Sequence, residues 1–215
     1  YESIRSMQRR QTLRAFHLPL ALAFEGEFRV RSFLAANVVG RIAGSGRRAA
    51  DDAVVVSAHY DHLGTWPELD GDRIFNGVID NAIGCAGLLE VARVLAALEE
   101  RPRRSVILLF TTAEEEGNLG ARYFLDHPPI PLPRMVANIN IDGLAFLDRF
   151  EDVMGIGAEL SSLGPTLQKT ARHLGLEVSR PQELALGQEA FVRSEQVVFA
   201  EAGIPGERGF VAEAF

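Results

Sequence analysis

Three features are scarce in this sequence of 215 residues: cysteine, long apolar runs and excess positive charge. The one cysteine, Cys85, excludes a disulfide within the chain, so cysteine usage does not indicate a cellular compartment. The longest apolar run, residues 18–24, is far shorter than the roughly 20 residues that cross a bilayer. The 22 Lys and Arg residues against 29 Asp and Glu residues give a net charge of −7. This balance argues against a partner that is nucleic acid or an anionic membrane, and it fits a protein that holds cations.

Length and composition indicate an ordinary globular chain. Hydrophobic residues make up 47% and charged residues 24%, which argues against intrinsic disorder, and 215 residues favour one domain. We expect residues 1–20, which are rich in arginine, to form an N-terminal extension or linker, and residues 21–215 to form the domain. The first residue is Tyr1 and no signal peptide is recognisable, so we expect the start of the chain to be missing or processed.

Continuous apolar runs alternate with helical spacing along the chain. Strands that are covered on both faces are apolar throughout, which predicts buried strands at 53–58, 105–110 and 135–141. Weaker patterns predict strands at 21–33, 37–42 and 177–178, and helices at 82–98, 119–125, 160–174 and 194–202. A further strand is expected to begin at 203–205, although 206–210 lacks the apolar pattern of a strand. The alternation implies crossover connections and therefore an α/β fold with a mainly parallel sheet.

Histidine and carboxylate side chains follow all three buried strands. Ligands bind at the carboxyl ends of the strands of an open parallel sheet, so residues that follow different strands meet at one edge. Imidazole and carboxylates from distant parts of a chain are the usual donors of a metal site. If the first buried strand persists, Asp61 points the same way as His59 and can hold its second ring nitrogen. The candidates are His59 and Asp61 after the first strand, Glu114 and Glu115 after the second, Asp142 after the third, and Asp80 before the helix at 82–98.

Each candidate also has an ordinary structural explanation. The acidic run 114–116 fits a solvated cluster near a helix start, where carboxylates suit the helix dipole. Asp80 fits a helix N-cap, and Asp142 fits a turn residue. His62 fits a structural role better than the role of a ligand. The convergence of the candidates on one edge of the sheet favours a metal site over these separate explanations.

Four segments resemble the motifs of the di-zinc aminopeptidase family, which includes secreted bacterial leucyl aminopeptidases and relatives of glutamate carboxypeptidase. They are residues 57–64, 76–81, 112–117 and 138–142, and the resemblance covers roughly residues 34–205. It implies a three-layer α/β sandwich around a mixed, mostly parallel sheet, with a zinc-peptidase-like catalytic domain at 21–215. It also implies two zinc ions per chain, a peptide substrate and a periplasmic or extracellular location.

The resemblance implies a role for each candidate. The family's zinc-dependent exopeptidases hydrolyse N-terminal amino acids from peptides with a metal-activated water. Glu114 is then the general base that takes a proton from that water, and Asp61 orients His59. The implied zinc ligands are His59 and Asp142 at the first ion, Glu115 at the second, and Asp80 between the two, with a cis peptide between Asp80 and Asn81.

Departures from the family leave two further hypotheses. The family's last zinc ligand is a histidine beyond the segment that matches 202–205, whereas here no histidine follows His173. We therefore expect the C-terminal part of the domain to be missing and the second zinc to be weak or absent. Ile83 and Glu195 stand where the family has serine and aspartate. The alternatives to an aminopeptidase are glutaminyl-cyclase-like acyl transfer and a non-catalytic, truncated or degenerate member; the sequence specifies neither the preferred N-terminal residue nor the oligomeric state.

Overall fold

The computed structural model of the chain describes residues 21, 23–27, 32–67, 70–144, 150–179 and 188–210. The chain divides into two compact units, Tyr1–Leu34 and Ala35–Phe215, and every described helix and strand belongs to the second. The N-terminal extension expected at residues 1–20 lies outside the described residues. The strand predicted over 21–33 is wrong for the described part of that stretch, which has no regular structure. Phe24 and Phe33 are exposed there, so these two side chains of the alternating pattern do not face a buried layer.

The second unit is built on a seven-stranded mixed sheet with the order β1-β3-β2-β4-β7-β5-β6. Four of its pairings, β3 with β2, β2 with β4, β4 with β7 and β5 with β6, are parallel, and β1 with β3 and β5 with β7 are antiparallel. The predicted mixed, mostly parallel sheet is therefore confirmed. The strands are β1 (Val38–Ile42), β2 (Ala53–His59), β3 (Ser105–Thr111), β4 (Met135–Ile141), β5 (Asp152–Ile156), β6 (Glu177–Val178) and β7 (Gly206–Phe210). The helices are α2 (Ile83–Ala97), α3 (Leu119–Asp126), α4 (Leu163–Leu174) and α5 (Gln196–Glu201), with short helical turns η1 (Ala49–Asp51), η2 (Val78–Ala82), η3 (Leu132–Arg134), η4 (Ala158–Leu160) and η6 (Gln188–Arg193).

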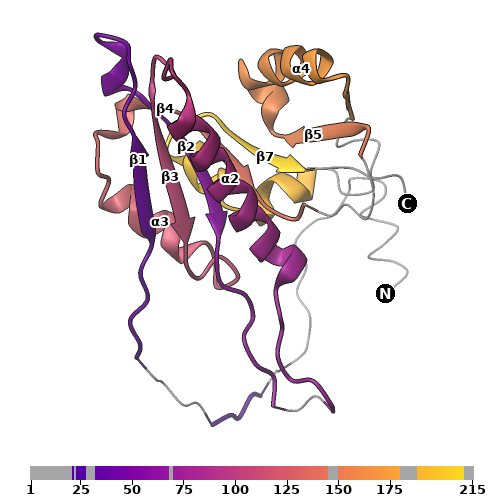
Figure 1. Cartoon of the computed structure of the whole chain (residues 1–215). Helices are drawn as coiled ribbons and strands as arrows, with labels where there is room; N and C mark the ends of the chain where they lie inside the picture. Colours follow the sequence, from indigo (N-terminus) through magenta and orange to yellow (C-terminus); the bar gives the residue numbers. More distant parts are fainter. Residues whose placement is uncertain are drawn as a thin grey trace. The chain divides into compact units, whose positions relative to one another are not determined.

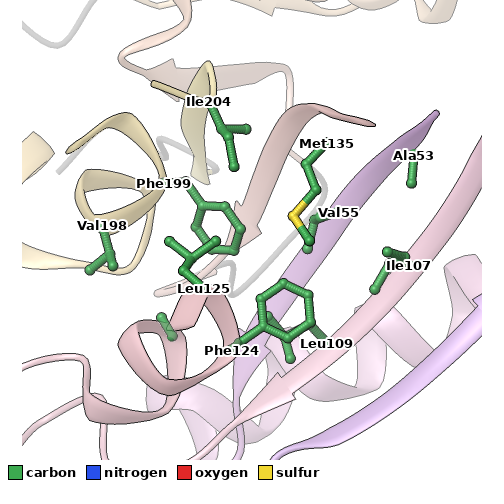
Figure 2. Close-up of a cluster of buried hydrophobic side chains, with 11 residues drawn as sticks. Ala53, Val55, Ile107, Leu109, Phe124, Leu125, Met135, Val198, Phe199 and Ile204 are labelled. Atoms are coloured by element: carbon green, nitrogen blue, oxygen red, sulfur yellow. The ribbon is translucent and has the colours of Figure 1, made fainter. Parts of the chain in front are cut away.

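Helices cover both faces of the central strands, which makes three layers (Figure 1). Successive side chains of a strand point to opposite faces, so β2 and β3 contribute to two separate clusters. One cluster joins alternate residues of these strands to α3 and α5 (Figure 2): Val55, Ile107 and Leu109 pack with Phe124 and Phe199. The other joins the intervening residues to α2: Val56, Ala58 and Leu108 pack with Leu88. Each large side chain that is fully buried contributes roughly 1.5–3 kcal/mol to folding, so both layers hold the central strands in place.

The segment at residues 206–210 forms strand β7 between β4 and β5, which corrects the prediction that it does not resemble a strand. Glycine replaces apolar side chains here because the backbone of β7 lies close to α5. A Cβ on Gly206 would come within 2.8 Å of the carbonyl oxygen of Gln196. The intervening Arg208 is directed to the polar edge of the sheet, where it pairs with Asp142. Strand β7 therefore lacks an apolar pattern for reasons of local packing.

Candidate metal centre

The carboxyl ends of β2, β3 and β4 lie side by side and bring the predicted residues together. His59 is the last residue of β2, and Asp142 directly follows β4. Glu114 lies three residues beyond the end of β3, and Asp80 lies in η2 just before α2. His59, Asp142 and Glu114 are buried, whereas the side chain of Asp80 is 51% exposed. The site therefore has a buried floor and one carboxylate on its open side.

His59 lies between two carboxylates. Its Nε2 atom is 2.9 Å from Oδ1 of Asp80 and 3.4 Å from Oδ1 of Asp142. Burial by itself lowers the pKa of His59, but hydrogen bonds with Asp142 and Asp80 outweigh it and raise the pKa to about 11. The two carboxylates thus favour a positive charge at Nε2, and a divalent cation between these atoms would supply such a charge.

The carbonyl oxygen of Asp61, rather than its carboxylate, contacts the second ring nitrogen of His59, Nδ1, at 2.8 Å. This corrects the predicted role of the Asp61 side chain. Strand β2 ends at His59, so the alternation that would align the two side chains does not reach Asp61. The carboxylate instead accepts hydrogen bonds from the hydroxyl of Thr112 and, at 2.9 and 2.7 Å, from the backbone N–H of Ala113. A backbone carbonyl on one ring nitrogen orients a metal-binding histidine as well as a carboxylate does.

Asp80 is positioned by the turn η2. The turn follows Gly77, whose φ of +65° suits glycine, and the Asp80–Asn81 peptide is cis, as the resemblance implies. The buried amide of Asn81 donates to the carbonyl of Ile141 at 2.8 Å and accepts from the N–H of Gly84 at 3.2 Å. These bonds fix the turn to the end of β4 and to the start of α2. Asp80 is therefore held over the strand ends by its neighbour.

Asp142 has one oxygen directed at His59 and the other held by the protein. The second oxygen, Oδ2, accepts from the hydroxyl of Ser194 and lies 3.2 Å from Nη2 of Arg208. Arg208 also donates through Nε to the carbonyl of Asp142 at 3.1 Å. Burial by itself raises the pKa of Asp142, but the hydrogen bond with His59 and the charge of Arg208 lower it. Asp142 is thus kept ionised with Oδ1 available to a cation.

A second group of donors shares Asp80 with the first. In the described residues, ligand atoms of His59, Asp80 and Asp142 lie within 4.8 Å of one another, and so do those of His62, Asp80 and Glu115. Nδ1 of His62 is 2.7 Å from Oε1 of Glu115. Asp80 is therefore common to two groups that could each hold a cation, and the second group includes His62, for which the sequence favoured a structural role.

Glu114 lies beside both groups without a place in either. Burial raises its pKa to about 7; the charge of His59 acts against this, and the carboxylates of Asp142, Glu115 and Asp80 add to it. The preceding residue, Ala113, has a φ of +54° and is held by the Asp61 carboxylate. The turn after β3 is thus constrained where it carries a carboxylate that is available for proton transfer.

Ser194 and Glu195 lie next to the candidate site, and the sequence marked only Glu195, as a departure from a family motif. Both are fully buried. The hydroxyl of Thr111 donates to the carboxylate of Glu195, and burial raises the pKa of Glu195 to about 7 even though this hydrogen bond and the charge of His59 lower it. Both residues directly precede α5, and no pattern in the sequence indicates their contacts with Asp142 and Thr111.

The donor set fits zinc. Histidine nitrogen and carboxylate oxygen are usual zinc ligands, and the histidine at the first group is oriented through its second nitrogen. Fold and site together define an α/β protein with a histidine- and carboxylate-lined metal centre at the carboxyl edge of its sheet. Residues 37–210 match the family described as Peptidase family M28, and the chain belongs to that family.

Two curated relatives illustrate matches to a little under half of the chain. A Vacuolar membrane protease of Candida dubliniensis is 40% identical over 92 residues, which are 43% of this chain and 9% of the relative. Endoplasmic reticulum metallopeptidase 1 of Mus musculus is 31% identical over 99 residues, 46% of this chain and 10% of the relative. The matched part of the chain thus spans about a tenth of the length of these relatives.

Solved structures share the fold over most of the chain. BSAP, a zinc aminopeptidase from Bacillus subtilis, superposes with a TM-score of 0.61 at 24% identity, over 82% of this chain and 40% of that protein. The glutaminyl cyclase of Bacteroides thetaiotaomicron superposes with a TM-score of 0.58 at 17% identity, over 80% of this chain and 62% of that protein. At these identities the likeness establishes the three-layer α/β fold, which is confirmed as predicted.

Proposed function

We propose that the protein is a zinc-dependent exopeptidase that hydrolyses N-terminal amino acids from peptides. The observation that carries the proposal is the pair of donor groups that share Asp80 beside the buried Glu114. Membership of Peptidase family M28 supports peptide hydrolysis, and the resemblance to di-zinc aminopeptidases supports the N-terminal preference.

Each residue then has a defined task. His59, Asp80 and Asp142 hold one ion, and Asp80 and Glu115 contribute to the second. Bound zinc supplies Lewis-acid chemistry, because it polarises the scissile carbonyl and favours ionisation of the attacking water. Glu114 accepts the proton of that water and passes it to the leaving amine. Asp61 acts through its carbonyl on His59 and through its carboxylate on the turn that carries Glu114.

A variant of the base tests this function. In Glu114→Gln the group that accepts the proton is lost while all proposed ligands remain. We expect hydrolysis of leucine p-nitroanilide to fall by about 100- to 10,000-fold, the usual contribution of a general base. Zinc content, measured by elemental analysis, is expected to stay at the level of the unmodified protein.

The matched control is Glu116→Gln, since Glu116 is exposed in the same acidic run. We expect it to retain turnover. Unchanged turnover in Glu114→Gln would refute the role of this carboxylate.

An N-acetylated leucine anilide separates the exopeptidase from an endopeptidase, because only an enzyme that requires a free N-terminus rejects it.

The same preparation discriminates the alternatives. Cyclisation of a peptide with N-terminal glutamine, without release of amino acids, would identify a glutaminyl cyclase. An enzyme of this kind is among the solved structures that share the fold. Bound zinc without either reaction identifies a non-catalytic member.

The location of the protein is a separate part of the proposal. No helix in the described ranges is long and apolar enough to cross a membrane. The names of two relatives place them in a vacuolar membrane and in the endoplasmic reticulum, and the family resemblance implies a periplasmic or extracellular site. We propose that this protein also acts outside the cytoplasm, which fractionation of the source cells would test.

A further inference from the structure

His62 and Glu115 lie against each other on the open side of the metal centre. Nδ1 of His62 is 2.7 Å from Oε1 of Glu115, and their side chains are only 19% and 24% exposed. Both ligand atoms lie within 4.8 Å of a carboxylate oxygen of Asp80. Three donors from three separate segments therefore converge on one point, next to the group that contains His59.

The protein holds His62 in this place through its surroundings. The loop that follows β2 is fixed to the end of β3, because the N–H of Tyr60 donates to the carbonyl of Thr111 at 3.0 Å and Asp61 accepts from Ala113. The ring of Phe75 meets the imidazole edge-on, with 6.0 Å between ring centroids. A Cβ on Gly77 would lie 3.1 Å from Cβ of His62, so glycine at this position makes room for the histidine.

We infer that His62 is the nitrogen ligand of the second metal ion, together with Glu115 and the shared carboxylate of Asp80. The inference rests on the two-ion centre of the proposed function and assigns a donor that the family resemblance does not. Each group then consists of one imidazole and two carboxylates, with Asp80 common to both. This composition is a usual one for zinc.

The competing explanation is that His62 only donates a hydrogen bond to Glu115 and so positions it. The substitution His62→Asn separates the two roles, because the asparagine amide can donate a hydrogen bond from about the position of Nδ1 but is a poor zinc ligand. Loss of a partner that only orients a ligand weakens metal affinity by about 10- to 100-fold, so loss of a ligand is expected to exceed 100-fold. His127→Asn is the matched control, since His127 is exposed and stacks on Tyr123 outside both groups.

The experiment titrates the dialysed 215-residue protein and its variants with Zn²⁺ and counts bound ions. The sequence alone predicts a weak or absent second zinc, but with His62 as its ligand we expect two ions in the unmodified protein and in His127→Asn. We expect one tightly bound ion in His62→Asn. With Co²⁺ in place of Zn²⁺, proton NMR of the unmodified protein is expected to show two strongly shifted, exchangeable imidazole N–H signals, of which His62→Asn loses one.

The outcomes distinguish this inference from the proposed function. Two tight ions in His62→Asn, or a single shifted imidazole signal in a protein that binds two ions, would overturn the assignment of His62 and leave the two-ion centre intact. Fewer than two ions in the unmodified protein would overturn both the assignment of His62 and the two-ion centre of the proposed function.

Discussion

Replacing Glu195 with glutamine tests how much a negative charge at this buried position lowers the free energy of unfolding. Glu195 is completely buried and accepts a hydrogen bond from Thr111. Burial raises its pKa from 4.5 to about 7, against the opposing effects of that hydrogen bond and of the charge of His59. The folded protein therefore favours the protonated carboxyl, whereas the unfolded chain ionises at the ordinary value. Glutamine keeps the acceptor oxygen for Thr111 and never carries charge.

The sign and size of the effect follow from this difference. Well below pH 4.5 the carboxyl is protonated in both the folded and the unfolded state, so its ionisation does not change the free energy of unfolding. Between pH 4.5 and 7 the unfolded chain loses a proton that the folded protein retains, so the free energy of unfolding falls as the pH rises. A shift of 2.5 pKa units corresponds to about 3 kcal/mol, which is the whole loss above pH 7.

The assay is urea unfolding followed by circular dichroism, with a chelator present, at pH values from 4 to 8. We expect Glu195→Gln to match the unmodified protein near pH 4 and to exceed its stability by about 3 kcal/mol at pH 8. Glu99→Gln is the control, because Glu99 is exposed and a surface substitution is expected to change stability by no more than about 0.5 kcal/mol. A flat difference for Glu195→Gln, or a variant that becomes less stable as the pH rises, would refute the reasoning.

Two further predictions concern the core and the support of a ligand. Phe199→Ala is expected to destabilise the protein by about 3–5 kcal/mol, since Phe199 is fully buried against Phe124. The control is Leu89→Ala, because Leu89 is 61% exposed and its substitution is expected to change stability by less than about 0.5 kcal/mol. Equal urea midpoints for the two variants would contradict this prediction. Ser194→Ala removes the hydroxyl that holds Oδ2 of Asp142, so zinc affinity measured against a competing chelator is expected to fall by about 10- to 100-fold, and an unchanged affinity would show that Arg208 alone positions this carboxylate.

The central strands could be predicted from the sequence because burial on both faces leaves only apolar residues, as in Val55 and Leu109. The carboxylate of Asp142 could be predicted with them, since the carboxyl ends of parallel strands share one edge. Strand β7 could not, although it lies in the same sheet. Gly206 is needed for the close approach to α5, and Arg208 faces a carboxylate, so neither apolar content nor alternation marks β7 as a strand.

The partnership of His62 with Glu115 depends on contacts that no periodicity encodes. The sequence pattern aligned the side chain of Asp61 with His59. In that arrangement the carboxylate would not be available to hold the loop that follows β2. The structure instead uses the Asp61 carboxylate to fasten that loop to Thr112 and Ala113. This attachment brings residue 62 over residue 115, and it leaves the backbone carbonyl of Asp61 to orient His59. One aspartate therefore acts on both donor groups, and its two functions become distinguishable only when the end of β2 is located at His59.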